Sequence, residues 1–142
     1  MNKFLKNKKI IVFDGVCLLC NKYVEFVAKY DNNDVFRFVS LQNKNILTKY
    51  IAKNSLINNT DSILLIKKSN SISTKSSAII YIASELKFPF NLFVCIKIIP
   101  KKLRDFIYDL IAKNRRNLFG EIDHCSILNQ SKIKNIEHKI ID

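Results

Sequence analysis

The stretch KKIIVFDGVCLLCNKYVEFVAKYD, residues 8–31, decides how the chain begins to fold. Its β-branched and aromatic run at 9–13 predicts a short buried strand. An Asp-Gly dipeptide ends that run, and from 16 to 30 the apolar residues recur at the spacing of a helix. Cys17 and Cys20 therefore fall where a strand is followed by a helix, and their chemistry there is the main question.

The rest of the chain predicts an α/β fold with a four-stranded mixed sheet. The expected elements are a strand at 35–39, a helix at 46–54, a hairpin of strands at 62–67 and 71–74, a helix capped by Ser76, a long helix opened by Pro100, and a last short helix carrying Ile133, Ile136 and Ile140. The order βαβα, then a hairpin, then helices implies a parallel βαβ unit with the first strand central. We expect the first two helices to cover one face of the sheet and the later helices the other.

Length and composition set the class of protein. The 142 residues predict one domain spanning 1–142. Lys and Arg number 24 against 12 Asp and Glu, a net charge of +12, but the charges are dispersed, which predicts no specific nucleic-acid site. No run is apolar enough for a membrane span or a secretory signal, so a cytoplasmic location is expected. The oligomeric state stays open.

The Cys-x-x-Cys pair after a strand is typical of a thioredoxin-like redox site. Residues three apart on a helix are close enough for a disulfide. At the first helical position Cys17 meets unpaired N–H groups and solvent, which favours its thiolate and makes it the attacking thiol. Cys20, less exposed, is the predicted resolving thiol. The expected partners are protein or small thiol and disulfide substrates, with no cofactor beyond the redox-active disulfide.

Other interpretations of the cysteines remain open. A zinc-binding domain needs two more ligands, and His124 with Cys125 are the paired candidates, at a spacing that suits zinc poorly; no metal is expected. In a second alternative, the protein is a basic binding or scaffold module, and both cysteines are inert buried residues. A thiol hydrolase would need His124 or His138 as its base, and neither has a recognisable orienting partner.

The segment FDGVCLLC, residues 13–20, resembles the signature of the DCC family of thiol-disulfide oxidoreductases, named for an Asp-x-x-Cys-x-x-Cys motif. The motif falls on Asp14, Cys17 and Cys20. The resemblance continues through FRFVSLQ, DSILLI, STKSSAII, IIPKKLRDFIYDLIAKNRRNLFG and DHC. It implies a thioredoxin-like fold and thiol-disulfide exchange.

One departure concerns the site where thioredoxin-like proteins place a cis-proline before the third strand, whose backbone pairs with substrate. Here Thr60, Asp61 and Ser62 occupy that place. Substrate docking by this route would use the backbone of Thr60 and Asp61.

Several single residues have more than one interpretation. Asp14 is a proton acceptor for Cys20 or a turn residue that binds N–H groups near Val16. Leu18 and Leu19 form an apolar collar suited to a protein substrate. Cys125 is a packed residue or a third thiol near the site.

Cys95 lies within the apolar segment LFVCIKII. The burial tendency of cysteine predicts that it is a core residue.

Overall fold

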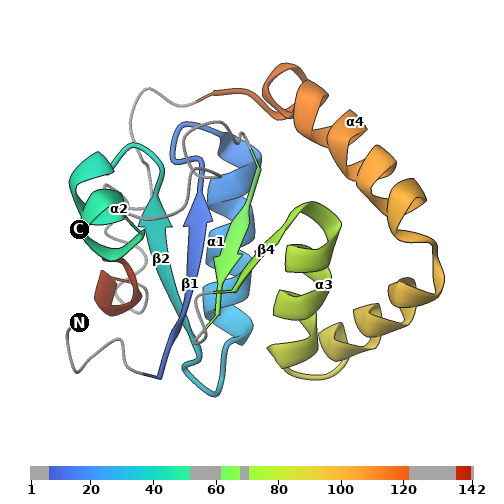
Figure 1. Cartoon of the computed structure of the whole chain (residues 1–142), viewed down its shortest axis with the longest axis horizontal. Coiled ribbons are helices and arrows are strands. Elements are labelled where there is room, and N and C mark those ends of the chain that lie inside the picture. Colours follow the sequence, from blue (N-terminus) through green and yellow to red (C-terminus); the bar gives the residue numbers. More distant parts are fainter. Residues whose placement is uncertain (1–6, 52–61, 68–70, 122–136, 142) are drawn as a thin grey trace.

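The computed structural model describes residues 7–51, 62–67, 71–121 and 137–141 (Figure 1). Its elements are β1 (Lys9–Phe13), α1 (Leu18–Tyr30), β2 (Phe36–Ser40), α2 (Lys44–Ile51), β3 (Leu64–Ile66), β4 (Ile72–Thr74), α3 (Lys75–Glu85), the 3-10 helix η3 (Phe90–Ile98), α4 (Lys101–Phe119) and the 3-10 turn η4 (Glu137–Lys139). The predicted order of strands and helices is confirmed. Ile133 and Ile136 lie outside the described residues, and the single domain over 1–142 stays a prediction.

The four strands form one mixed sheet in the order β2-β1-β3-β4. Strand β1 pairs in parallel with β2 and antiparallel with β3, and β3 and β4 form the predicted hairpin. The first strand is therefore internal, and the α/β thioredoxin-like arrangement is confirmed. The turn that carries the two cysteines follows the carboxyl end of this internal strand (Figure 1).

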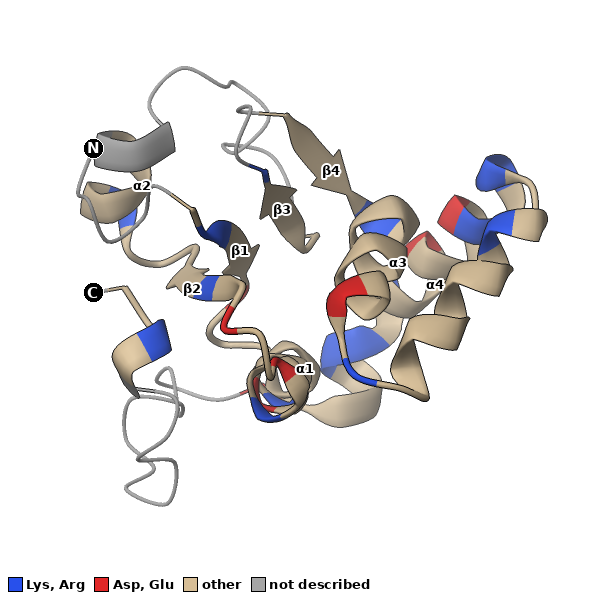
Figure 2. Ribbon diagram, turned by 90° about the horizontal axis from the view of Figure 1, so that it is seen from below, with Lys and Arg blue, Asp and Glu red and all other residues tan. Residues whose placement is uncertain are grey.

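The helices divide between the two faces of the sheet differently from the prediction. Alternate residues of β1 point to opposite faces: Ile11 and Phe13 belong to the core under α1 and α3, whereas Val12 belongs to the core with Leu47 of α2. Figure 2 shows α1 and α2 on opposite sides of the sheet. The expectation that the first two helices share a face is wrong, because the handedness rule governs the crossover between parallel strands and not the connection from β2 to the antiparallel β3.

Helix α4 packs mainly on α3 and α1. It begins after Pro100 as predicted, but its apolar stripe faces outward: Leu103, Phe106, Ile107, Leu110 and Ile111 are all exposed. The expectation that the later helices cover the face opposite the first two is wrong, because α3 shares a core with α1 and α4 packs on these two helices. None of the described helices is long and apolar enough to cross a membrane.

Two smaller expectations are also corrected. Cys95 is exposed on η3, because that 3-10 helix has no buried residue at all. Ser76 does not cap α3, which begins two residues earlier than predicted, at Lys75, with Thr74 at its cap position. The Ser76 hydroxyl instead donates a hydrogen bond to the Asp105 carboxylate and joins α3 to α4.

Candidate thiol site at the start of helix α1

The two cysteines occupy the first turn of α1. Cys17 is the N-cap residue, with extended backbone angles, one position earlier than predicted. Its sulfur accepts a hydrogen bond from the Cys20 N–H at 3.4 Å, as the side-chain oxygen of an ordinary N-cap residue does. Both cysteines are free thiols. This contact directs one of the unpaired N–H groups of the helix start at the Cys17 sulfur.

Both thiols are buried, which overturns the expectation that Cys17 meets solvent. Cys17 is 0% exposed and Cys20 is 3% exposed. The chain that leaves α4 covers the helix start: the Leu18 N–H donates to the Gly120 carbonyl at 3.4 Å, and Cys17 forms an isolated β-bridge with Glu121. Gly120 has a φ of 91°, a backbone conformation that favours glycine. The cover is a tertiary contact that no local sequence pattern predicts.

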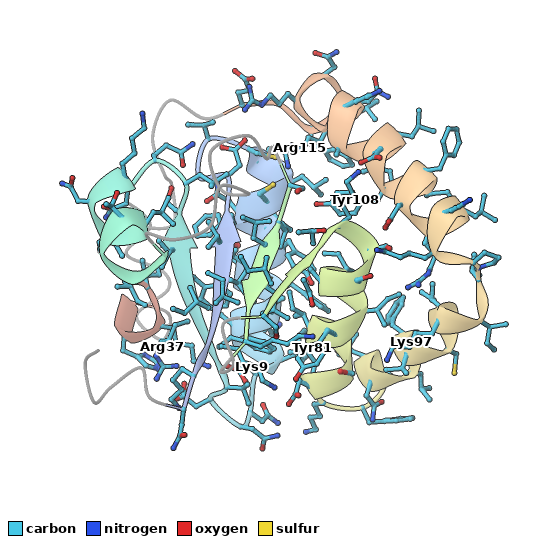
Figure 3. All side chains as sticks on the ribbon, in the orientation of Figure 1. Lys9, Arg37, Tyr81, Lys97, Tyr108 and Arg115 are labelled. Carbon is cyan, nitrogen blue, oxygen red and sulfur yellow. The ribbon has the colours of Figure 1, made fainter. Side chains whose placement is uncertain are left out.

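Arg115 of α4 joins the two acidic groups of the site. Its Nη1 donates to the Cys20 sulfur at 3.3 Å, and its Nη2 donates to the Asp14 carboxylate at 3.2 Å. Figure 3 shows Arg115 pointing from α4 toward the start of α1. The ion pair is buried, with 5% of the Arg115 side chain and 4% of the Asp14 side chain exposed. A fixed positive charge therefore lies against Cys20.

Asp14 is fully engaged by hydrogen-bond donors. One oxygen accepts from the Val16 N–H at 3.2 Å and from Gln42 at 2.9 Å, and the other accepts from Arg115 and from Arg116 at 2.9 Å. Burial raises the pKa of the Asp14 carboxyl, but the hydrogen bonds from Arg116, Gln42 and Val16 and the charge of Arg115 outweigh burial and lower the pKa below its ordinary value. The contact with Val16 fits the turn interpretation of Asp14, and a carboxylate with a low pKa is a weak proton acceptor.

The surroundings of Cys20 strongly disfavour ionisation of its thiol. Burial, together with a hydrogen bond to Cys17, raises the pKa of Cys20 to about 12, although the charge of Arg115 opposes that rise. Cys20 therefore stays protonated at neutral pH in this arrangement.

Two amide side chains hold the turn between β1 and α1. Gln42 accepts from the Gly15 N–H at 2.9 Å while it donates to Asp14. Asn21, itself buried, donates to the carbonyls of Gly15 at 2.7 Å and Cys17 at 2.9 Å. The two bonds to Gly15 pair its N–H and its carbonyl in the turn, whereas the Cys17 carbonyl also accepts the Asn21 N–H of the helix.

A side chain of α4 contacts the segment just before β3. The Tyr108 hydroxyl accepts a hydrogen bond from the Ile63 N–H at 3.0 Å, and Figure 3 shows Tyr108 pointing inward from α4. Burial raises the pKa of Tyr108, although the hydrogen bond from Ile63 lowers it. Thr60 and Asp61, the predicted docking residues, lie outside the described residues, as does Cys125.

The structure thus brings together Asp14, Cys17 and Cys20 as predicted. Leu18 and Leu19 are half-buried next to them, and Leu19 packs against the main core. Sequence reasoning missed Arg115, Arg116, Gln42 and Asn21. The stretches that carry the family resemblance contain the first three, but their spacing from Cys17 gives no sign of contact.

No three metal-binding side chains cluster within the part of the chain that the structure describes. His124 and Cys125, the zinc candidates, lie outside that part. His138 is described and exposed in η4.

Comparison with known proteins agrees with this site. The family model described as DCC1-like thiol-disulfide oxidoreductase matches residues 11–121, a range that includes every site residue named above from Asp14 to Gly120. The chain is 35% identical over 119 residues to the uncharacterized protein YuxK of Bacillus subtilis, covering 84% of this chain and 86% of that protein. It is 33% identical over 121 residues to a chloroplastic DCC family protein of Arabidopsis thaliana, covering 84% and 70% respectively. No solved structure matches significantly.

Proposed function

Because this chain belongs to the DCC1-like thiol-disulfide oxidoreductase family, we propose that it exchanges disulfides with protein or small thiol substrates through Cys17 and Cys20. One observation carries the proposal. The Cys17 sulfur caps α1 and accepts the Cys20 N–H, a contact that is stronger when the sulfur is a thiolate. Cys17 is accordingly the attacking thiol and Cys20 the resolving thiol.

The exchange proceeds in two displacements. The Cys17 thiolate attacks one sulfur of a substrate disulfide, so that a Cys17–substrate disulfide forms and the other substrate sulfur leaves as a thiolate. Cys20 then loses its proton to that thiolate and attacks the Cys17 sulfur. The Cys17–Cys20 disulfide forms, the second substrate sulfur leaves, and two electrons have passed to the substrate. A dithiol or thiol reductant returns the pair to its starting state, and the same steps in reverse oxidise a substrate dithiol.

Arg115 supports the second displacement in this proposal. The pKa of about 12 makes Cys20 a poor nucleophile until its proton leaves, and the Arg115 guanidinium at 3.3 Å stabilises the negative charge that develops on the sulfur. Asp14 holds Arg115 and Arg116 in place and neutralises part of their charge. Its low pKa favours this positioning role over the alternative in which it takes the Cys20 proton.

Substrate contact is assigned to the neighbours of the thiols. Leu18 and Leu19 provide a half-buried apolar rim, and the backbone of Thr60 and Asp61 remains the proposed docking segment. The Cys17 sulfur becomes accessible when the contact of Gly120 and Glu121 with the start of α1 opens. The proposed compartment is the cytoplasm, where thiols are kept reduced. The absence of specific nucleic-acid binding stays a prediction.

A trapping experiment tests the assignment. In a chain carrying Cys95→Ser and Cys125→Ser, only the motif thiols remain. With a mixed aromatic disulfide as probe, Cys20→Ser accumulates a stable adduct on Cys17, because attack proceeds and resolution cannot. Cys17→Ser forms no such adduct at neutral pH. The parent with both thiols releases the probe completely.

The opposite pattern would reverse the two roles. If neither variant forms an adduct and zinc copurifies with the chain, the redox assignment fails and the zinc-binding alternative replaces it.

A further inference from the structure

The exposed apolar residues are confined to one region of the chain. Within the described residues, every large hydrophobic side chain that is exposed lies between positions 88 and 119. These residues are Phe88, Leu92, Phe93, Ile98, Ile99, Leu103, Phe106, Ile107, Leu110, Ile111, Leu118 and Phe119. Figure 3 shows side chains along η3 and α4 that point away from the rest of the molecule. We call the exposed apolar side of η3 and α4, with the lysines beside it, the outer face.

Helix α4 is turned so that its polar side meets the protein. Tyr108 binds the Ile63 N–H just before β3, and Arg115 binds Cys20 of α1. Asp105 and Asp109 accept from Ser76 and Lys75 of α3. An amphipathic helix on a protein surface ordinarily buries its apolar side. Here the inward side is fixed by hydrogen bonds and ion pairs, so the apolar stripe is left outside. Phe106 is 64% exposed and Leu110 is 55% exposed.

The exposed charges beside the stripe are positive, except for Glu121, which follows α4 and pairs with Arg116. Residues 86–120 contain two acidic residues, Asp105 and Asp109, and both are bound to α3. The exposed charged residues of this segment are basic: Lys87, Lys97, Lys101, Lys102, Lys113 and Arg116. Figure 2 shows Lys and Arg positions, coloured blue, on α4.

The lysines are placed to flank the apolar stripe. Lys102 lies four residues before Phe106, and Lys113 lies three residues after Leu110, so each is a neighbour of the stripe on the helix surface. Large apolar side chains bordered by lysines are the features by which interfacial helices bind membranes.

We propose that the outer face docks on the surface of a membrane that contains anionic phospholipids. The apolar side chains enter the boundary between headgroups and acyl chains, and the lysines contact the phosphate groups. Charge complementarity selects this occupant. A second copy of the chain would bring the same basic border against itself. Asp105 and Asp109 are bound to α3 and the exposed Glu121 is paired with Arg116, so these acidic residues offset little of the repulsion between the lysines. The proposal is independent of the chemistry at Cys17 and Cys20.

Vesicle sedimentation of the full chain under reducing conditions tests the proposal. Wild type is expected to bind vesicles of equal parts phosphatidylcholine and phosphatidylglycerol at least about tenfold more tightly than vesicles of phosphatidylcholine alone, and less tightly as salt rises. The double variant Phe106→Asp with Leu110→Asp is expected to lose about tenfold or more of that affinity. Both residues are exposed, so the variant keeps the wild-type circular dichroism spectrum and unfolding midpoint.

Two charge-reversal variants test whether binding depends on the lysines of the outer face or only on the net charge of the chain. Lys101→Glu with Lys102→Glu changes the outer face, whereas Lys22→Glu with Lys44→Glu makes the same charge change at exposed positions of α1 and α2. The first pair is expected to weaken binding about tenfold or more, and the second to keep most of it. Equal weakening by both pairs, or no binding to either vesicle, overturns the proposal. If the chain forms a dimer in lipid-free solution and the double variant Phe106→Asp with Leu110→Asp dissociates that dimer, the membrane proposal is overturned and the outer face binds a second copy of the chain.

Discussion

Arg115 donates a hydrogen bond to the Cys20 sulfur across 3.3 Å, although 95 positions separate the two residues in the chain. The same guanidinium binds Asp14, so one side chain of α4 joins the turn after β1 to the first turn of α1. The C-terminal part of the chain therefore completes a thiol site whose sulfur atoms both come from the N-terminal part. Helix α4 has two sides with different tasks: an inner polar side at the thiols and the outer face.

Arg115→Gln is expected to slow resolution of the mixed disulfide. The substitution removes the positive charge that opposes the high pKa of Cys20, so the thiolate becomes rarer and the adduct on Cys17 lives longer at a given pH. The measurement is the rate of probe release against pH in the chain without Cys95 and Cys125. Arg116→Gln is the matched control: both arginines bind Asp14, but the hydrogen bond to the Cys20 sulfur comes from Arg115. Equal slowing by both variants would show that Arg115 acts only through Asp14.

The buried thiols are expected to react slowly with alkylating agents in the folded chain. Cys95 is exposed, whereas Cys17 and Cys20 are covered, so Cys95 should be modified at least about tenfold faster at neutral pH. Mass spectrometry of each site over time measures the rates of alkylation. In urea, where the chain is unfolded, the three cysteines should react at similar rates. Modification of Cys17 as fast as Cys95 in the folded chain would contradict the cover by Gly120 and Glu121.

Asp14→Asn is expected to make stability less sensitive to acid. The folded-state pKa of Asp14 lies below its unfolded value, so its stabilising contribution is present above about pH 4 and is lost as pH falls toward the folded pKa. The wild-type free energy of unfolding should therefore drop more between about pH 6 and about pH 3 than that of the variant. At neutral pH the variant should be less stable by about 1–3 kcal/mol, since Arg115 loses its buried partner.

Asp34 also makes the free energy of unfolding depend on pH, in both the wild type and the variant. Hydrogen bonding to Arg37 also lowers its pKa, against a smaller effect of burial, so acid sensitivity falls in Asp14→Asn without disappearing. Urea unfolding at several pH values measures both chains. An unchanged pH slope in the variant would show that folding does not lower the pKa of Asp14.

Tyr108→Phe is expected to reduce the free energy of unfolding by about 1–2 kcal/mol, because it leaves the Ile63 N–H without its acceptor. The control is Tyr30→Phe, since Tyr30 is packed through its ring against Phe26 and Phe90 and keeps that ring. The two urea unfolding midpoints make the comparison. Equal stability of the two variants would contradict a structural role for the Tyr108 hydroxyl.

Much of the fold is present in local patterns. The β-branched run at 9–13 and the helical spacing that follows it identified β1 and α1. The hairpin of β3 and β4 followed from an apolar run at 62–67 and a weaker strand pattern at 71–74 with a turn between them. The Cys-x-x-Cys pair located the candidate thiols at the start of α1. These features depend on neighbours a few residues apart, whose steric and hydrogen-bonding preferences act within the segment.

Contacts between distant segments had no such local signal. The periodicity of α4 shows that Leu103, Phe106 and Leu110 share a side, but the same spacing describes a stripe turned inward or outward. The outward turn results from the ion pairs and hydrogen bonds of its polar side with α3, with Ile63 before β3, and with α1. Likewise the burial of Cys17 depends on where the chain leaves α4 at Gly120. Burial and long-range ion pairing depend on how whole elements pack, and that packing is defined only when the chain has folded.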